Sequence, residues 1–227
     1  MIDSLFFPPV EQANSRGLLA FDGELDPIWL FDAYTHGIFP WPITGFSRAA
    51  SMAWWSPNPR AIFSFNRVHV PQRLLRTIKQ QRFDVVCDTD FRGVITNCAT
   101  AQDREDETWI TPPMIDAYCE LYRLGIAHSV EAYLNDKLVG GVYGVAIHGL
   151  FAAESMFYKE PNASKVALIQ LLHHLKVRDY RLVDIQMITD NTRRFGAIEI
   201  PRTEYMRRLN AALNAKVSFG TELCLIR

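Results

Sequence analysis

The spacing of apolar and polar positions divides the chain near residue 61. Before that point proline, glycine and tryptophan interrupt the pattern, and only one helix is predicted, over 27–36, with Asp26 as its N-cap and Pro27 at its first position. Beyond it, strands of period two alternate with amphipathic helices. The pattern therefore predicts a small loop-rich N-terminal domain over 1–61 and a larger domain over 62–227.

The larger domain is predicted to contain one sheet with helices around it. Strands are expected at 61–65, 83–87, 128–134, 137–145, 148–157, 183–188, 197–200 and 221–226. Helices are expected at 71–81, 90–101, 112–124, 162–177, 190–195 and from Pro201 onward. Because an antiparallel meander is followed by an alternation of helix and strand, we expect an α+β fold with a mixed, largely antiparallel sheet flanked by helices.

Composition narrows the class of protein. The 227 residues are 48% hydrophobic and 22% charged, which is typical of a globular protein and excludes a disordered chain. The net charge of -1 gives no overall attraction to nucleic acid, so a polyanion needs a local patch. No apolar run approaches a membrane span, and we expect a cytoplasmic, monomeric protein. The cysteines have no metal-ligand spacing, so no metal is expected; they are Cys87, Cys98, Cys119 and Cys224.

The predicted strand 183–188 carries a carboxylate and a carboxamide among apolar residues. Side chains two positions apart on a strand share one face, so we expect Asp184 and Gln186 to point together. A buried charge is costly without partners, so this pair is a candidate catalytic site. The alternative is that Asp184 only accepts hydrogen bonds at a strand end.

Aromatic residues concentrate in two proline-rich segments, 37–42 and 52–60, and again at Trp109. Flat rings held by stiff turns can stack on a nucleic-acid base, and Trp41 and Trp109 are candidates. The alternative is that these tryptophans form the core of a small lobe.

A basic helix face is predicted between residues 67 and 82, where no acidic residue occurs. Arg73, Arg76 and Lys79 follow one another at intervals of three, which places them on one side of a helix. Because like charges repel, this face indicates a phosphate contact; a solvated surface is the alternative.

The strand around Glu154 leads into the loop 159–165, which precedes a helix. Asn162 or Ser164 could cap that helix, or its free amides could bind an oxygen-rich ligand; both remain open. Nearby apolar residues could line a pocket or fill the core, and these are Val142, Phe151, Met156, Leu171 and Leu175.

A series of longer motifs resembles one family. GIFPW, WWSPNPR, TWIT, GGVYG, ESMF, NASK, DIQ and EIPR occur in this order between about residues 17 and 209, and together they resemble the leucyl/phenylalanyl-tRNA-protein transferases. The resemblance implies a GNAT-like larger domain and no cofactor. It also implies transfer of leucine, phenylalanine or methionine from aminoacyl-tRNA to proteins that begin with arginine or lysine, which marks them for N-end-rule degradation.

The resemblance also implies roles for individual residues. Asp184 and Gln186 match the catalytic pair, Trp41 and Trp109 match residues around the terminal adenosine, and Glu154, with Ser155 beside it, matches the substrate site. The pocket for the amino-acid side chain would contain Val142, Phe151, Leu171 and Leu175. The acceptor stem would contact Arg76 and Lys79, and Arg73 on the same predicted helix face is expected to join them. The sequence departs from the family at 189–191, which is Thr-Asp-Asn in place of the usual Asn-Asp-His.

The implied chemistry is undemanding, because an aminoacyl ester is already activated and mainly has to be held near a neutral amine. Asp184 could assist proton loss from that amine, and Gln186 could bind the aminoacyl group. Two other functions remain possible. An acyl-CoA transferase would need a pyrophosphate loop, but its nearest candidate, 193–198, ends in isoleucine where glycine or alanine is required. An RNA-binding module would leave the Asp184 and Gln186 pair without a purpose.

Overall fold

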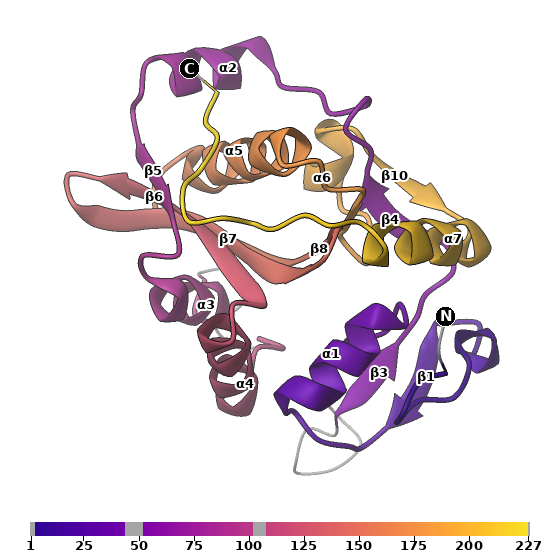
Figure 1. The fold of residues 1–227 in the computed structure, drawn as a ribbon. Helices are drawn as coiled ribbons and strands as arrows, with labels where there is room; N and C mark the ends of the chain where they lie inside the picture. The colour runs from indigo at the N-terminus through magenta and orange to yellow at the C-terminus, as the bar shows by residue number, and fades with distance from the viewer. Residues whose placement is uncertain (1–2, 44–51, 102–107, 227) are drawn as a thin grey trace.

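The computed structural model describes residues 3–43, 52–101 and 108–226 (Figure 1). The N-terminal part begins with the short 3-10 helix η1 (Val10–Gln12) and contains a three-stranded sheet in the order β1 (Leu18–Phe21), β3 (Ala53–Trp55), β2 (Phe39–Pro40). Helix α1 (Pro27–Thr35) starts where the sequence predicts, because the Asp26 carboxylate accepts a hydrogen bond from the Trp29 amide at 2.8 Å.

The larger sheet has seven strands. Their spatial order is β10 (Ala197–Ile200), β4 (Arg60–Phe63), β9 (Leu182–Asp184), β8 (Leu150–Tyr158), β7 (Lys137–Ile147), β6 (Ala127–Leu134), β5 (Asp84–Cys87). Only β8 and β9 run parallel to each other, and the other neighbouring pairs are antiparallel. The predicted α+β class with a mixed, largely antiparallel sheet is therefore confirmed.

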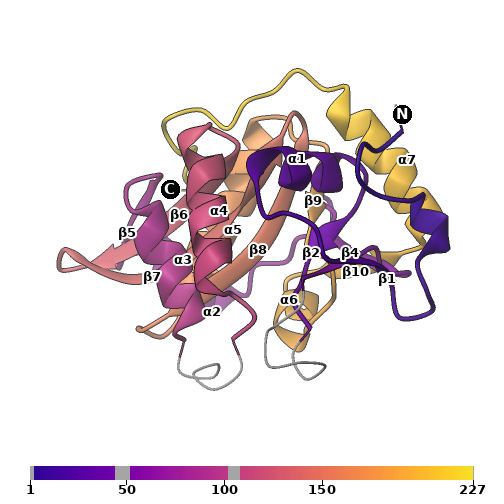
Figure 2. The ribbon, with the colours of Figure 1, turned by 90° about the horizontal axis from the view of Figure 1, so that it is seen from below.

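Helices cover both faces of this sheet (Figure 2). Helices α2 (Gln72–Lys79) and α5 (Ala163–Val177) contribute to one hydrophobic core cluster. The other cluster contains residues of α3 (Phe91–Ala99), α4 (Pro112–Arg123) and α7 (Arg202–Leu213). The short helix α6 (Asp190–Arg194) precedes β10. The second of these clusters continues into the N-terminal part, where it includes Leu30 and Trp54. The small lobe therefore shares its core with the rest of the molecule.

Two glycines of the GGVYG motif allow close approaches that position the site. A Cβ on Gly144 would overlap the carbonyl oxygen of Ala152 and the ring of Phe151, and a Cβ on Gly140 would lie 2.8 Å from the Ser164 amide nitrogen. Beside Gly144, the β7 and β8 register shifts, because Tyr143 pairs with Ser155 and Gly144 with Ala153. Glu154 is therefore the extra residue of a β-bulge, a feature that redirects a side chain.

Two predicted strands are wrong in part or whole. The strand expected at 183–188 ends at Asp184, because Gln186 adopts a left-handed backbone with φ of 55°. The strand expected at 221–226 is absent from the described structure. Instead, the amides of Cys224 and Ile226 donate to His174 Nδ1 at 3.0 Å and Gln170 Oε1 at 2.8 Å. Side chains of α5 thus replace a neighbouring strand as the partners of this segment.

Among the described helices, none is both long enough and apolar enough to cross a membrane.

Candidate active site

A buried ion pair links the two parts of the chain. The Arg60 Nε and Nη2 groups donate to Asp184 Oδ1 and Oδ2 at 2.9 and 2.6 Å, and both side chains are 1% exposed. Tyr205 and the Gln186 amide donate two further hydrogen bonds to the same carboxylate, each at 2.9 Å. With four donors around it, the Asp184 carboxylate is held in one orientation.

The Arg60 guanidinium is fixed equally firmly. It lies between the rings of Phe39 and Tyr205, at 4.7 and 4.6 Å from their centroids, and donates to the Gly37 carbonyl oxygen at 3.1 Å. Burial opposes its charge, but the Asp184 carboxylate raises the pKa of Arg60 above its usual value. Arg60 and Tyr205 were not predicted as site residues from the sequence. A buried Asp184 requires a cation, and Arg60 is the basic residue at the start of the buried strand β4.

Gln186 reaches the site in a different way from the one expected. Because β9 ends at Asp184, strand alternation does not bring the two side chains together. The backbone amide of Gln186 binds the Asp184 carboxylate, while its side-chain Nε2 donates to Glu154 Oε1 at 2.9 Å. A left-handed backbone at a residue other than glycine costs about 1–3 kcal/mol and is common at functional sites.

Glu154 connects Gln186 to a pair of tyrosines. Its Oε2 accepts a hydrogen bond from the Tyr118 hydroxyl at 3.3 Å, and that hydroxyl lies 2.5 Å from the hydroxyl of Tyr34 on α1. Burial raises the pKa of Glu154 to about 8, and burial also raises the pKa of both tyrosines. Glu154 is thus a carboxyl group that titrates near neutral pH. No pattern in the sequence points to the two tyrosines, because they come from helices that are distant along the chain.

A pocket of about 290 Å³ opens beside Glu154 and Gln186. Its apolar wall consists of Phe63, Val142, Ala153, Met156, Leu168, Ile185 and Met187, and its polar wall includes Ser155, Thr189, Asn191 and Thr192. The structure brings the predicted residues Val142, Glu154, Ser155, Met156 and Gln186 into this wall. It does not bring Phe151, Leu171 and Leu175 there, because they are buried deeper in the core around α5. The spacing of apolar residues along a strand cannot tell a residue in the pocket wall from one in the buried core.

Trp41 and Trp109 come together although they are far apart in the sequence. Their rings are stacked with centroids 5.3 Å apart and an angle of 30° between planes, and both are partly exposed. Trp41 is held in place because its carbonyl oxygen accepts a hydrogen bond from Trp55 Nε1 at 3.0 Å. The pair offers an aromatic surface for a planar group.

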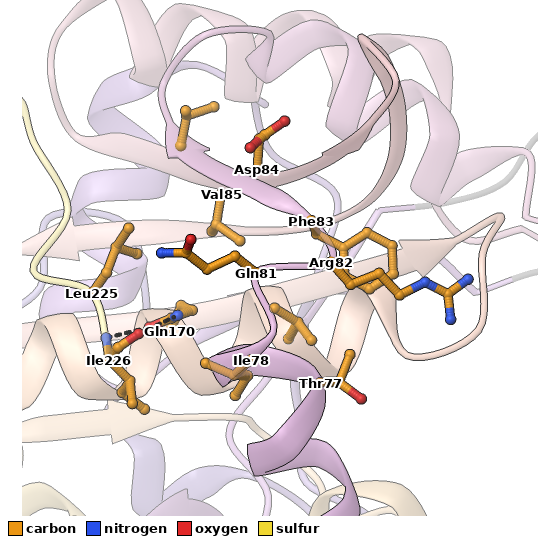
Figure 3. Close-up of a pocket in the computed structure, with 12 residues that line it drawn as sticks. Thr77, Ile78, Gln81, Arg82, Phe83, Asp84, Val85, Gln170, Leu225 and Ile226 are labelled. Atoms are coloured by element: carbon orange, nitrogen blue, oxygen red, sulfur yellow. Dashed lines mark hydrogen bonds between the residues drawn. The ribbon is translucent and has the colours of Figure 1, made fainter.

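The basic residues Arg73, Arg76 and Lys79 all lie on the exposed side of α2, while Leu74 and Ile78 on the opposite side are buried against the core. This helix also borders a second cavity, of about 470 Å³, between β5, α5 and the C-terminal segment (Figure 3). None of the predicted site residues lines it, and the Gln170 amide on its wall already binds the Ile226 backbone. Glu154 and Gln186, with the pocket beside them, therefore form the candidate active site.

The arrangement suits acyl transfer without a protein nucleophile. It combines an apolar pocket, a carboxamide donor and a titratable carboxyl group within one wall. Among the described residues, no group of three or more histidine, cysteine, aspartate or glutamate side chains is placed to hold a metal ion.

Comparison with known proteins identifies the family. The family model described as leucyl/phenylalanyl-tRNA protein transferase matches residues 62–210, and the model of its N-terminal domain matches residues 23–58. The chain belongs to this family. A relative from Pseudomonas putida with the name leucyl/phenylalanyl-tRNA--protein transferase is 47% identical over 205 residues, which cover 89% of each chain. One of the same name from an Anaeromyxobacter species is 46% identical over 209 residues, covering 92% of this chain and 87% of its own.

Membership of the transferase family makes the protein an enzyme, and its motifs fall on the site described above. Gly37 and Phe39 of GIFPW contact the Arg60 of WWSPNPR, which binds the Asp184 of DIQ. Similarity to solved structures is more distant. A ribosomal-protein-alanine N-acetyltransferase from Brucella melitensis biovar Abortus is 16% identical, with a TM-score of 0.34 over 49% of this chain and 86% of its own.

Proposed function

We propose that this transferase moves leucine or phenylalanine, and less readily methionine, from aminoacyl-tRNA to the N-terminal arginine or lysine of acceptor proteins. The observation that supports this best is the apolar pocket beside Glu154 and Gln186. The pocket is sized for a single side chain, and the stacked Trp41 and Trp109 rings suit the terminal adenine. The product would begin with a residue that marks it for N-end-rule degradation in the cytoplasm.

In the proposed mechanism the protein mainly positions the two substrates. The apolar wall holds the amino-acid side chain, and Gln186 donates its amide toward the aminoacyl group while Asp184 holds Gln186 in place. The acceptor amine attacks the ester carbonyl, the ester bond breaks, and the ribose oxygen leaves with a proton. Asp184 is a positioning residue here, because its carboxylate is fully hydrogen-bonded.

In its ionised form, Glu154 supplies the negative charge for the acceptor. Among the described residues that line the pocket, Glu154 is the only one with a carboxylate. Its side chain is partly exposed. A desolvated carboxylate favours a cationic side chain over a neutral one. We therefore assign Glu154 to the arginine or lysine of the acceptor.

The direct test mixes the protein with phenylalanyl-tRNA and a peptide that begins with arginine. We expect phenylalanine to appear at the peptide's amino terminus, as measured by mass spectrometry, and no product with an N-acetylated peptide. If the protein bound the tRNA without transfer, it would be an RNA-binding module. If coenzyme A stabilised it against heat and charged tRNA did not, the acyl-CoA function would replace this one.

The basic face of α2 gives an electrostatic prediction. If Arg76 contacts a phosphate, Arg76→Ala should weaken binding of charged tRNA and lower the slope of log K against log salt by about 0.7–0.9. The choice between leucine and phenylalanine should not change, because phosphate contacts do not recognise the amino acid. Lys137→Ala, at an exposed position in the hairpin, serves as the control. Unchanged slopes for Arg73, Arg76 and Lys79 variants would place the acceptor stem elsewhere.

A further inference from the structure

A groove next to the amino-acid pocket has no role in the mechanism above. It has a volume of about 710 Å³ and is lined by residues at the end of β8, at the start of α5 and in helix α6. Figure 1 shows where these three elements lie. Met156 and Asn191 line both the groove and the pocket. The groove is therefore continuous with the place where the aminoacyl group is proposed to bind.

The start of α5 in this groove lacks hydrogen-bond acceptors. Asn162 occupies the N-cap position with a left-handed backbone, φ of 74°, and its side chain makes no capping hydrogen bond. The sequence left open whether this loop caps the helix or binds a ligand. Asn162 does not cap the helix. Across the described residues, the amides of Ser164 and Lys165 have no acceptor. These amides can donate to a ligand.

The Ser164 side chain gives independent support. It lines the groove, its residue is only 3% exposed, and its hydroxyl has no hydrogen-bond partner in the part of the chain that the structure describes. At the groove wall the hydroxyl can donate to, or accept from, a group bound there. An oxygen-rich ligand in the groove would satisfy both the hydroxyl and the helix amides.

The side chains that line the groove carry a net positive charge, which favours an anionic ligand. Lys165 and Arg194 line it, and neither forms an ion pair with a described residue. The acid Asp190 also lines it, which leaves one net positive charge before the helix dipole is added. Glu160, within the loop 159–165, is already paired with Arg82 at 3.2 Å.

We propose that this groove binds a phosphodiester of the single-stranded acceptor end of aminoacyl-tRNA, next to the aminoacylated nucleotide. Ser164, Lys165 and Arg194 would hold its oxygens together with the first amides of α5. The proposal rests on the proposed function, because the adjoining pocket must hold the aminoacyl group. The groove would thus contact the nucleic acid close to the reacting ester, whereas the exposed face of α2 would contact it elsewhere.

Donors with and without phosphate provide the test. Transfer is measured from phenylalanylated CCA trinucleotide, which contains phosphodiesters, and from 3′-phenylalanyl-adenosine, which contains none. Lys165→Ala, Arg194→Ala and Ser164→Ala should each lower kcat/KM for the trinucleotide about tenfold, as expected for a lost hydrogen bond to a charged group. All three should keep the wild-type rate with the adenosine donor.

Lys176→Ala is the matched control, because it removes the same charge at the exposed far end of α5. It should behave as wild type with both donors. Equal losses with the two donors, or no loss with the trinucleotide, would overturn the phosphate assignment. Failure of the proposed function is distinguishable, because the wild-type protein would then transfer phenylalanine from neither donor.

Discussion

Asp184→Ala is expected to lose about 3–5 kcal/mol of stability and nearly all transfer activity. The substitution leaves the Arg60 guanidinium buried without its counter-charge, and removing one partner of a buried ion pair has a cost of this size. It also removes the acceptor of the Gln186 amide, so the Gln186 side chain loses its fixed direction. Urea denaturation measures the first effect, and phenylalanine transfer to a peptide measures the second.

A double variant separates the two effects. Replacing both partners by apolar residues, Arg60→Met with Asp184→Leu, removes the unpaired charge and should restore most of the lost stability. Transfer should remain low, because leucine cannot accept the Gln186 amide. If the double variant regained stability and transferred phenylalanine at the wild-type rate, the Asp184 carboxylate would matter only for folding and would have no role in the mechanism. Gln186→Ala should lower transfer without the loss of stability.

At a pH above 8, where Glu154 is ionised, Glu154→Gln is expected to lose the preference for an arginine-first peptide over a glutamine-first peptide by about 100-fold, the equivalent of a few kcal/mol for a lost charge pair. The reason is that an ionised, desolvated carboxylate stabilises the acceptor cation, and glutamine has the same shape without the charge. The affinity for charged tRNA should stay the same. If the variant instead bound charged tRNA poorly and kept its preference, Glu154 would hold the aminoacyl end.

The pH dependence of this preference follows from the raised pKa of Glu154, about 8. Below pH 8 the free carboxyl is mostly protonated, so the wild-type preference for arginine should grow as pH rises through 8. Both peptides carry the same α-amine, so its titration cancels from the ratio of kcat/KM values. The ratio for Glu154→Gln should not change with pH.

Stability should depend on pH in the opposite sense. The folded protein binds the Glu154 proton up to pH about 8, whereas the unfolded chain releases it near pH 4.3. The free energy of unfolding of the wild type therefore decreases as pH rises from about 4.3 to about 8. Glu154→Gln lacks this titration and should become more stable than wild type as pH rises toward 8. Glu131, with a raised pKa of about 7, contributes equally to both proteins.

The sequence by itself determined the elements that depend on local signals. Helix α1 begins at the Asp26 cap, and the hairpin between β6 and β7 turns at Asn135 and Asp136, which both have the positive φ that such a turn requires. The motifs from GIFPW to EIPR, read in order, gave the family that the comparisons confirm. Alternation and capping operate within a few residues, so they can be inferred from a single chain.

Only the tertiary structure decided how the site is assembled. Arg60 and Asp184 are 124 positions apart, and nothing local to either residue shows that they form a pair. The bulge at Glu154 and the left-handed backbone at Gln186 break the strand alternation on which the expected shared face depended. Likewise, Asn162 could have capped α5 by its sequence, but it adopts a left-handed backbone and its side chain makes no capping hydrogen bond. Contacts between distant segments set these directions, and their energies depend on the packing of the whole fold.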